Sequence, residues 1–344
     1  MSRTVRALAV LLVSWLVLVP VAGGASAAVA RTPEPFTVKD PEIDESSGLA
    51  ASRRHKDVYW THNDSASCEG QPNCDKGPYV YAVDGTTGRT VAKVTMQGID
   101  PRDMEAISLG PDGNLYVGDI GDNFDGRWQE VWIYRFPEPS TLRNTTVTPT
   151  RFTVRYDDGP RDAESLMVHP KTGRAYIASK NDEGKGGLYE GPEKLNSSGV
   201  NTFRRIAKVG LWATDGAFSP DGSRLILRSY FSAQMYRWKA GRPSAMGTVS
   251  VPVQPQGESV TFTPDGRTVM FGSERQASRV EPVELDERLL PESVPRKDRD
   301  RGNGGSSPDD DSPPGSSDSK VTWGLVALVG VALLALTRRK RGNE

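Results

Sequence analysis

The sequence has 344 residues, a formal net charge of −1, and 43 Lys and Arg against 44 Asp and Glu. The basic residues are scattered rather than gathered into a stripe, so we expect no nucleic-acid partner. When the apolar ends and a low-complexity segment are set aside, enough chain remains for one large hydrophobic core.

Residues 1–30 have the three parts of a secretory signal peptide. Arg3 and Arg6 form the positive segment, and residues 7–21 form the apolar segment. The small residues 25–30 twice fit an A-x-A cleavage pattern, which would start the mature chain near Ala28 or Arg31. An uncleaved anchor is the alternative.

The other end of the chain has the features of a tethered membrane anchor. Residues 291–320 are rich in Gly, Ser, Pro and Asp and predict a disordered linker. Residues 321–337 carry no charge and would span roughly 25 Å as a transmembrane helix. The basic tail, residues 338–344, predicts a cytoplasmic C-terminus by the positive-inside rule. We therefore expect a single-pass cell-membrane protein with its domain outside, although a buried core helix is the alternative.

The chain contains two cysteines, Cys68 and Cys74. In an exported protein, two close cysteines in a Gly- and Pro-containing segment indicate a disulfide that closes a surface loop. A zinc site is the alternative, but it would need further ligands, and only His55 and His62 lie nearby in the sequence.

The central part of the chain is built from a repeated β-hairpin. Each copy has a short strand, a P-D-G or K-T-G type turn in most units, and a second strand. The copies recur about every 45–60 residues, which is typical of propeller blades. The five copies begin at Ser47, Glu105, Glu164, Thr214 and Glu258.

Two further alternating stretches follow most hairpins, so each unit has about four strands, as a propeller blade does. The fifth unit shows only three, and residues 35–40 (PFTVKD) can supply the fourth from the N-terminus. We therefore predict an all-β fold over residues 31–290, a β-propeller of five blades closed by an N-terminal strand. Six blades and a two-sheet sandwich are the alternatives.

The segments SSGLA, THND, DMEAISLGPDGNLYVGD and DAESLMVHP carry a resemblance. They resemble WD40-like (PD40) repeats and, more closely, the secreted propeller family named for the esterase-like activity of phytase. The resemblance covers most of residues 36–290. It implies a propeller fold and defines no activity, because that family is itself largely uncharacterised.

Acidic residues recur at the starts of the predicted inner strands and the ends of the second strands, which share one face of a propeller. Clustered carboxylates repel one another, and a hard cation such as Ca²⁺ would offset the repulsion. Pairing with arginines, or hydrogen bonds from backbone N–H groups within each blade, are the alternatives. The predicted metal or ligand rim consists of Glu105, Glu164, Glu258, Asp103, Asp162, Asp119, Asp122, Asn123 and Asp64.

His62 is the histidine best placed to act as an acid or base at this rim. Established catalytic motifs, including Walker A and HExxH, do not occur in the sequence. The sequence thus does not decide whether the protein is an enzyme. A module that binds an extracellular ligand or protein is the favoured function, and a metal-assisted phosphoesterase or esterase is the alternative.

Overall fold

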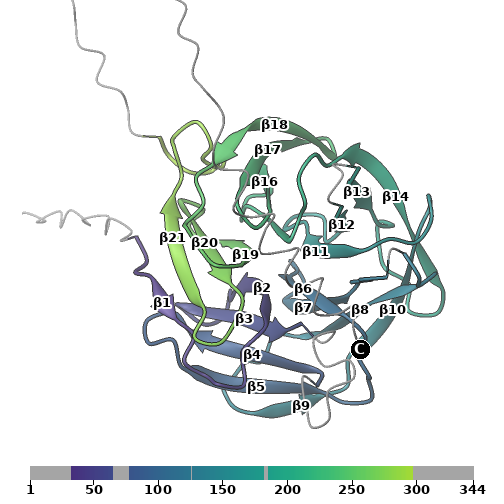
Figure 1. Cartoon of the computed structure of the whole chain (residues 1–344), viewed down its shortest axis with the longest axis horizontal. Helices are drawn as coiled ribbons and strands as arrows, with labels where there is room; N and C mark the ends of the chain where they lie inside the picture. The colour runs from purple at the N-terminus through teal and green to yellow at the C-terminus, as the bar shows by residue number, and fades with distance from the viewer. Residues whose placement is uncertain (1–31, 65–76, 125, 182–184, 297–344) are drawn as a thin grey trace, which may run out of the picture. The chain divides into compact units, whose positions relative to one another are not determined.

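A computed structural model describes residues 32–64, 77–124, 126–181 and 185–296 (Figure 1). Every regular element within these ranges is a β-strand, which confirms the all-β prediction for them. A search of the same ranges finds no helix with the length and apolar character needed to cross a membrane. The predicted signal peptide, the Cys68–Cys74 disulfide and the transmembrane helix lie outside the described residues and stay predictions.

The strands form four hydrogen-bonded sheets. The first consists of β2 (Ser46–Ala51), β3 (Val58–Asn63), β4 (Tyr79–Asp84), β5 (Thr90–Met96) and β9 (Thr145–Val147). The second consists of β6 (Met104–Leu109), β7 (Asn114–Asp119), β8 (Val131–Pro137), β10 (Thr150–Tyr156), β14 (Val200–Lys208), β13 (Gly187–Glu190), β12 (Ala175–Ser179) and β11 (Ala163–Val168). The third consists of β15 (Asp215–Phe218), β16 (Arg224–Arg228), β17 (Ala233–Lys239) and β18 (Arg242–Val249). The fourth consists of β19 (Gly257–Phe262), β20 (Thr268–Ser273), β21 (Arg279–Glu284) and β1 (Phe36–Thr37).

One antiparallel pattern of about four strands recurs through these sheets. The eight-stranded sheet contains two copies of it, β6-β7-β8-β10 and β11-β12-β13-β14, which meet along a parallel pairing of β10 with β14. The first sheet adds a short parallel strand, β9, at the outer edge of β5. Parallel pairings between outer strands therefore occur at two places, between β10 and β14 and between β5 and β9.

The first strand of each copy lies at the centre of the molecule. Strands β2, β6, β11, β15 and β19 contact one another in that order, and β19 contacts β2 (Figure 1). The other strands of each copy follow outward. Sheets arranged radially around a ring of inner strands are the architecture of a β-propeller.

The N-terminal strand joins the last sheet, as the sequence predicts. In β1, Phe36 pairs with Val280 of β21 in antiparallel register, and the backbone N–H of Val38 donates to the Ser278 carbonyl at 2.9 Å. Phe36 is buried and stacks on Tyr59 with ring centroids 5.5 Å apart. The strand therefore links the last sheet to the first sheet through both hydrogen bonds and core packing.

The predicted hairpin turns are present at the ends of the inner strands. Gly113, Gly173, Gly222 and Gly266 all have φ near +70°, a left-handed conformation that favours glycine. Each glycine N–H donates back across its turn, as from Gly222 to the Ser219 carbonyl at 2.8 Å. The P-D-G and K-T-G patterns thus fix where four of the five inner strands turn back.

Packing continues past the boundary predicted at residue 290. Val294 is 6% exposed and belongs to the core of the third and fourth sheets. The N–H groups of Glu292 and Ser293 donate to Ser223 and Asp221 in the turn before β16, each at 2.9 Å. The first residues of the predicted linker therefore lie against the propeller.

Candidate functional site

Acidic side chains start the inner strands at equivalent positions, and a β-bulge recurs there. In β6 the register shifts between Met104 and Ala106, so that Glu105 has no direct partner on β7. The same shift in β11 leaves out Glu164, and the one in β2 leaves out Ser47. In β19 the shift spans Glu258. Because a bulge redirects a side chain away from the regular pleat, it sets the direction of these side chains at the channel mouth.

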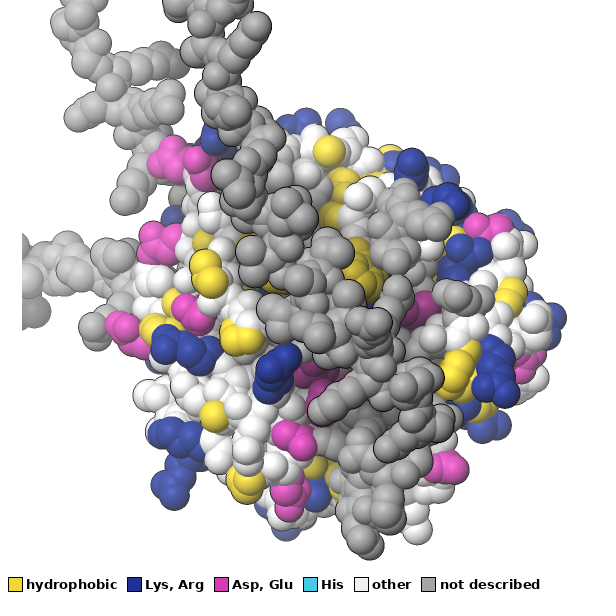
Figure 2. All heavy atoms as spheres, viewed as in Figure 1, with side chains coloured by type: hydrophobic (Ala, Val, Ile, Leu, Met, Phe, Trp, Pro, Cys, Tyr) yellow, Lys and Arg dark blue, Asp and Glu magenta, His cyan; other side chains and the backbone are white. Residues whose placement is uncertain are grey.

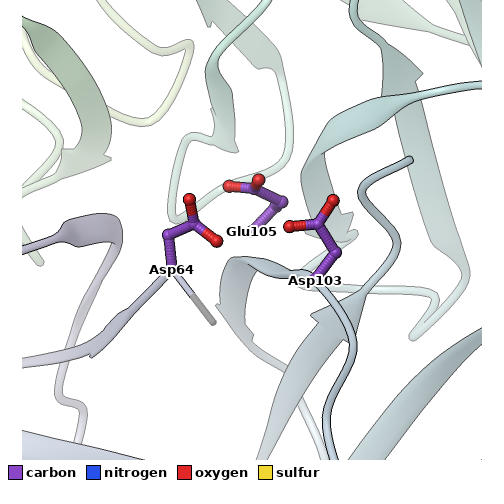
Figure 3. Close-up of side chains that lie close together, drawn as sticks. All are labelled: Asp64, Asp103 and Glu105. Atoms are coloured by element: carbon purple, nitrogen blue, oxygen red, sulfur yellow. The ribbon is translucent and has the colours of Figure 1, made fainter. Parts of the chain in front are cut away.

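Three carboxylates from two neighbouring sheets meet at this mouth. Asp64 follows β3, Asp103 immediately precedes β6, and Glu105 lies within β6. One carboxylate oxygen from each residue lies within 4.8 Å of the others, and Figure 3 shows the three side chains converging. We call this group the carboxylate triad.

Hydrogen bonds from neighbouring side chains reach only some of the carboxylate oxygens of the triad. Ser47 Oγ donates to Glu105 Oε2 at 2.8 Å, and Asn123 Nδ2 donates to Asp103 Oδ2 at 3.3 Å. Asp103 is only 1% exposed, yet its Oδ1 has no hydrogen-bond partner among the described residues. A buried acceptor left in this way costs free energy unless a cation, a proton or a water molecule reaches it.

Burial and mutual repulsion perturb the acid–base chemistry of the triad. Burial raises the pKa of Asp103 to about 9, and the charges of Asp64 and Asp162 add to the effect. Burial also raises the pKa of Glu105 well above its usual range, with further contributions from Asp64 and Glu164. Without a counter-ion the Asp103 carboxyl therefore keeps its proton at neutral pH, and a bound cation would have to displace it.

Lys180 is a cation that acts on this group of acids. It follows β12 and forms an ion pair with Glu164, whose side chain is 5% exposed. Burial alone would lower the pKa of Lys180, but Glu164, Tyr230 and Glu105 raise it well above its usual value. The lysine is therefore charged, and it neutralises Glu164.

Glu258 interacts electrostatically with both Arg228 and Glu274. Burial raises the pKa of Glu258 to about 7, opposed by Lys180, a hydrogen bond from Gln256 and Arg228. Burial, Glu258 and Glu45 raise the pKa of Glu274 to about 9. Arg228 is fully buried and donates through one nitrogen to the Ser259 and Gly272 carbonyls, both at 2.9 Å.

Several predicted rim residues are instead bonded to the local backbone. Asp119 accepts the N–H of Asp103 at 2.8 Å and the hydroxyl of Tyr134 at 3.0 Å. Asp122 accepts the N–H of Trp128 at 2.7 Å, and Asp162 accepts the N–H of Asp122 at 2.8 Å. Asp119 and Asp122 hold loops within their own blade, whereas Asp162 bonds to a loop of the neighbouring blade.

His62 lies behind the mouth rather than at its surface. Its side chain is fully buried, and its Nδ1 contacts the Asn63 carbonyl at 3.0 Å. Burial lowers the pKa of His62 to about 4, so the ring is neutral at pH 7. The predicted acid–base role for His62 stays a prediction, and the structure shows it packed within the sheet.

Figure 2 shows acidic side chains at the surface close to the middle of the viewed face, with basic and acidic side chains interspersed around the periphery. The strand-end pattern that predicts the acidic rim also places Lys180 and Arg228 there, whereas Ser47 and Gln256 are rim residues that it does not predict. Ser47 carried a usable signal, because it occupies the position in its hairpin that Glu105 and Glu164 occupy in theirs.

Neither a protein-family model nor a curated protein matches the chain. The resemblance to the esterase-like phytase family therefore stays a prediction. Among solved structures, the chain is similar to a chain of the mitotic checkpoint complex, with 11% identity, a TM-score of 0.37, and coverage of 69% of this chain and 63% of that one.

Two other solved structures have comparable similarity. One is a PQQ-bound aldose sugar dehydrogenase from Streptomyces coelicolor, with 11% identity, a TM-score of 0.41, and coverage of 75% and 97% of the two chains. The other is a candidate 6-phosphogluconolactonase from Bacteroides uniformis, with 13% identity, a TM-score of 0.37, and coverage of 74% and 69%. These neighbours have β-propeller-like folds, and the similarity is too low to transfer an activity, a ligand or a partner.

Proposed function

We propose that this protein is a membrane-anchored, extracytoplasmic β-propeller of five blades that binds a divalent cation at the acidic mouth of its channel. The ring of five inner strands supports the blade number. The signal peptide at residues 1–30 and the apolar segment at residues 321–337 support the location and the single-pass anchor.

The cation site rests on one observation, the convergence of three carboxylates from two sheets within 4.8 Å. Asp103 contributes a buried oxygen with no hydrogen-bond partner among the described residues, which is the kind of atom that a cation would satisfy. All three side chains offer only oxygen, the donor that Ca²⁺ and Mg²⁺ prefer. Ca²⁺ is the better candidate because it accepts irregular oxygen sets, whereas Mg²⁺ requires near-octahedral geometry.

Calorimetric titration of Ca²⁺ and Mg²⁺ into EDTA-treated full-length protein in detergent tests the site. Saturating Ca²⁺ should also raise the unfolding temperature, because a ligand at 100 times its Kd stabilises the native state by about 2.7 kcal/mol. Asp103→Asn and Glu105→Gln should remove the binding heat. Asp84→Asn, at an exposed turn, is the matched control and should retain it. Identical titrations of wild type and Glu105→Gln would refute the site.

A metal-assisted hydrolase is the second candidate, and Glu258 is the observation that favours it. A carboxyl with a pKa of about 7 can accept and return a proton near neutral pH. Hydrolysis of p-nitrophenyl phosphate that needs Ca²⁺ and disappears in Glu258→Gln would support this activity. Absence of turnover in a protein shown to bind Ca²⁺ would leave binding as the function.

A further inference from the structure

Three aromatic side chains form a continuous surface near the same mouth. Trp212 lies between β14 and β15, and Tyr230 and Phe231 lie between β16 and β17. The Trp212 and Tyr230 rings meet edge to face with centroids 5.2 Å apart, and Tyr230 and Phe231 lie 6.2 Å apart. Phe231 is 71% exposed, while the other two are half-buried. We call these three residues the aromatic platform.

The platform borders polar groups that have both donors and acceptors. Lys180 Nζ lies 5.5 Å from the ring centroids of Trp212 and of Tyr230. Its ion-pair partner Glu164 is 4% exposed, and the second oxygen of that carboxylate has no hydrogen-bond partner among the described residues. Glu258, which accepts from Gln256 Nε2 at 3.2 Å, acts electrostatically on Tyr230. Ammonium, phenol, amide and carboxylate groups are therefore linked by contacts next to the rings.

This combination distinguishes among the ligands that an exposed aromatic surface can take. An organic cation would suit the rings and the carboxylates, but the Lys180 ammonium already lies near two of the three rings and would repel it. A simple anion would be repelled by the carboxylates of Glu164 and Glu258. A sugar ring has one apolar C–H face that packs on an aromatic ring, and its hydroxyls both donate and accept hydrogen bonds.

We propose that the aromatic platform, with Lys180, Glu164 and Glu258, is a saccharide-binding subsite. A sugar ring packs on Trp212 and Phe231, and its hydroxyls reach the polar groups below. The inference names the ligand class for the proposed binding function of this mouth. It does not depend on a cation in the carboxylate triad, because the two groups of residues are different.

Calorimetric titration of cellohexaose and of chitohexaose into the full-length protein tests the subsite. We expect at least one to bind, and Trp212→Ala and Phe231→Ala each to weaken binding about tenfold, which corresponds to the loss of one stacked aromatic contact. Phe124→Ala is the matched control, because Phe124 is also an exposed phenylalanine, 45% exposed, but packs on Trp128 instead. Phe231 is so exposed that its replacement should leave the unfolding temperature unchanged, which keeps the test valid if Trp212→Ala is unstable.

Each titration is repeated with EDTA and with Ca²⁺, so that the two proposals can fail separately. Saccharide binding that persists in EDTA supports the subsite even if the Ca²⁺ titration finds no cation site. Three results would overturn the subsite: no binding of either oligosaccharide at millimolar concentration, equal binding by wild type and Phe231→Ala, or a Phe231-dependent dimer in sedimentation that excludes the sugar.

Discussion

The near-neutral pKa of Glu258 predicts a specific dependence of stability on pH. Burial raises this pKa to about 7 from its ordinary value of 4.5. Between these two values the native state holds a proton that the unfolded state has lost. The free energy of unfolding therefore falls as pH rises, by up to about 1.4 kcal/mol per pH unit, and this contribution levels off above pH 7.

Replacing Glu258 by Gln removes this contribution while keeping an oxygen to accept the bond from Gln256. Relative to wild type, the variant should gain about 2.5 kcal/mol of unfolding free energy between pH 5 and pH 8. The side chain is only 4% exposed, so solvent screening should reduce this gain little. Urea denaturation in EDTA, followed by tryptophan fluorescence at both pH values, measures the difference.

Asp84→Asn is the control for this experiment. Despite some burial, hydrogen bonds from Thr87 and Thr86 lower the pKa of Asp84, so its effect on stability should be nearly the same at pH 5 and pH 8. If the wild type and Glu258→Gln differ by the same free energy at both pH values, then Glu258 has no raised pKa and the electrostatic account of the mouth is wrong.

Three further variants test other parts of the structure by thermal or urea unfolding. Lys180→Met leaves the buried Glu164 without its cation and should lower the free energy of unfolding by about 3 kcal/mol in EDTA. A double variant that adds Glu164→Gln should recover this stability. A loss under 1 kcal/mol would contradict the pairing. Phe36→Ala should cost about 3 kcal/mol because the closing strand loses its buried ring, and an unchanged unfolding temperature would argue against closure by this strand. In Gly257→Ala the new methyl would lie 1.8 Å from an Arg228 nitrogen and should destabilise the protein. Gly210→Ala, which has open space at its Cβ, should not. Equal effects of the two substitutions would show that the Arg228 position is not fixed.

The hairpins and the closing strand could be predicted because their signals are local or follow from counting. A P-D-G turn requires a glycine with positive φ at one position, and Gly222 and Gly266 have it. The last unit shows only three strands up to residue 285, so the N-terminal segment was predicted to supply the fourth. Such inferences need no knowledge of which side chains touch.

The chemistry of the mouth depended on information that local patterns lack. The acids were found, but whether each is bonded to the backbone or free for a ligand depends on strand register. The bulges at Glu105 and Glu164 arise from pairing with strands β7 and β12, and composition does not reveal them. Antiparallel strands that end at the same edge predict that Lys180 and Glu164 share a face, but only the side-chain positions show that they form an ion pair. The aromatic platform joins two loops and carries no repeat signal.

The pairing of β1 with β21 also determines the order in which the protein can be completed. Phe36 is synthesised early, but its partner Val280 emerges only near the end of the domain. During synthesis the first segment must therefore wait without its partner strand, while the sheets between can already form. Closing so long a loop carries a large entropic cost and makes the last step slow. We expect a chain cut short before residue 279 to keep an open sheet edge and to be a substrate for quality-control proteases.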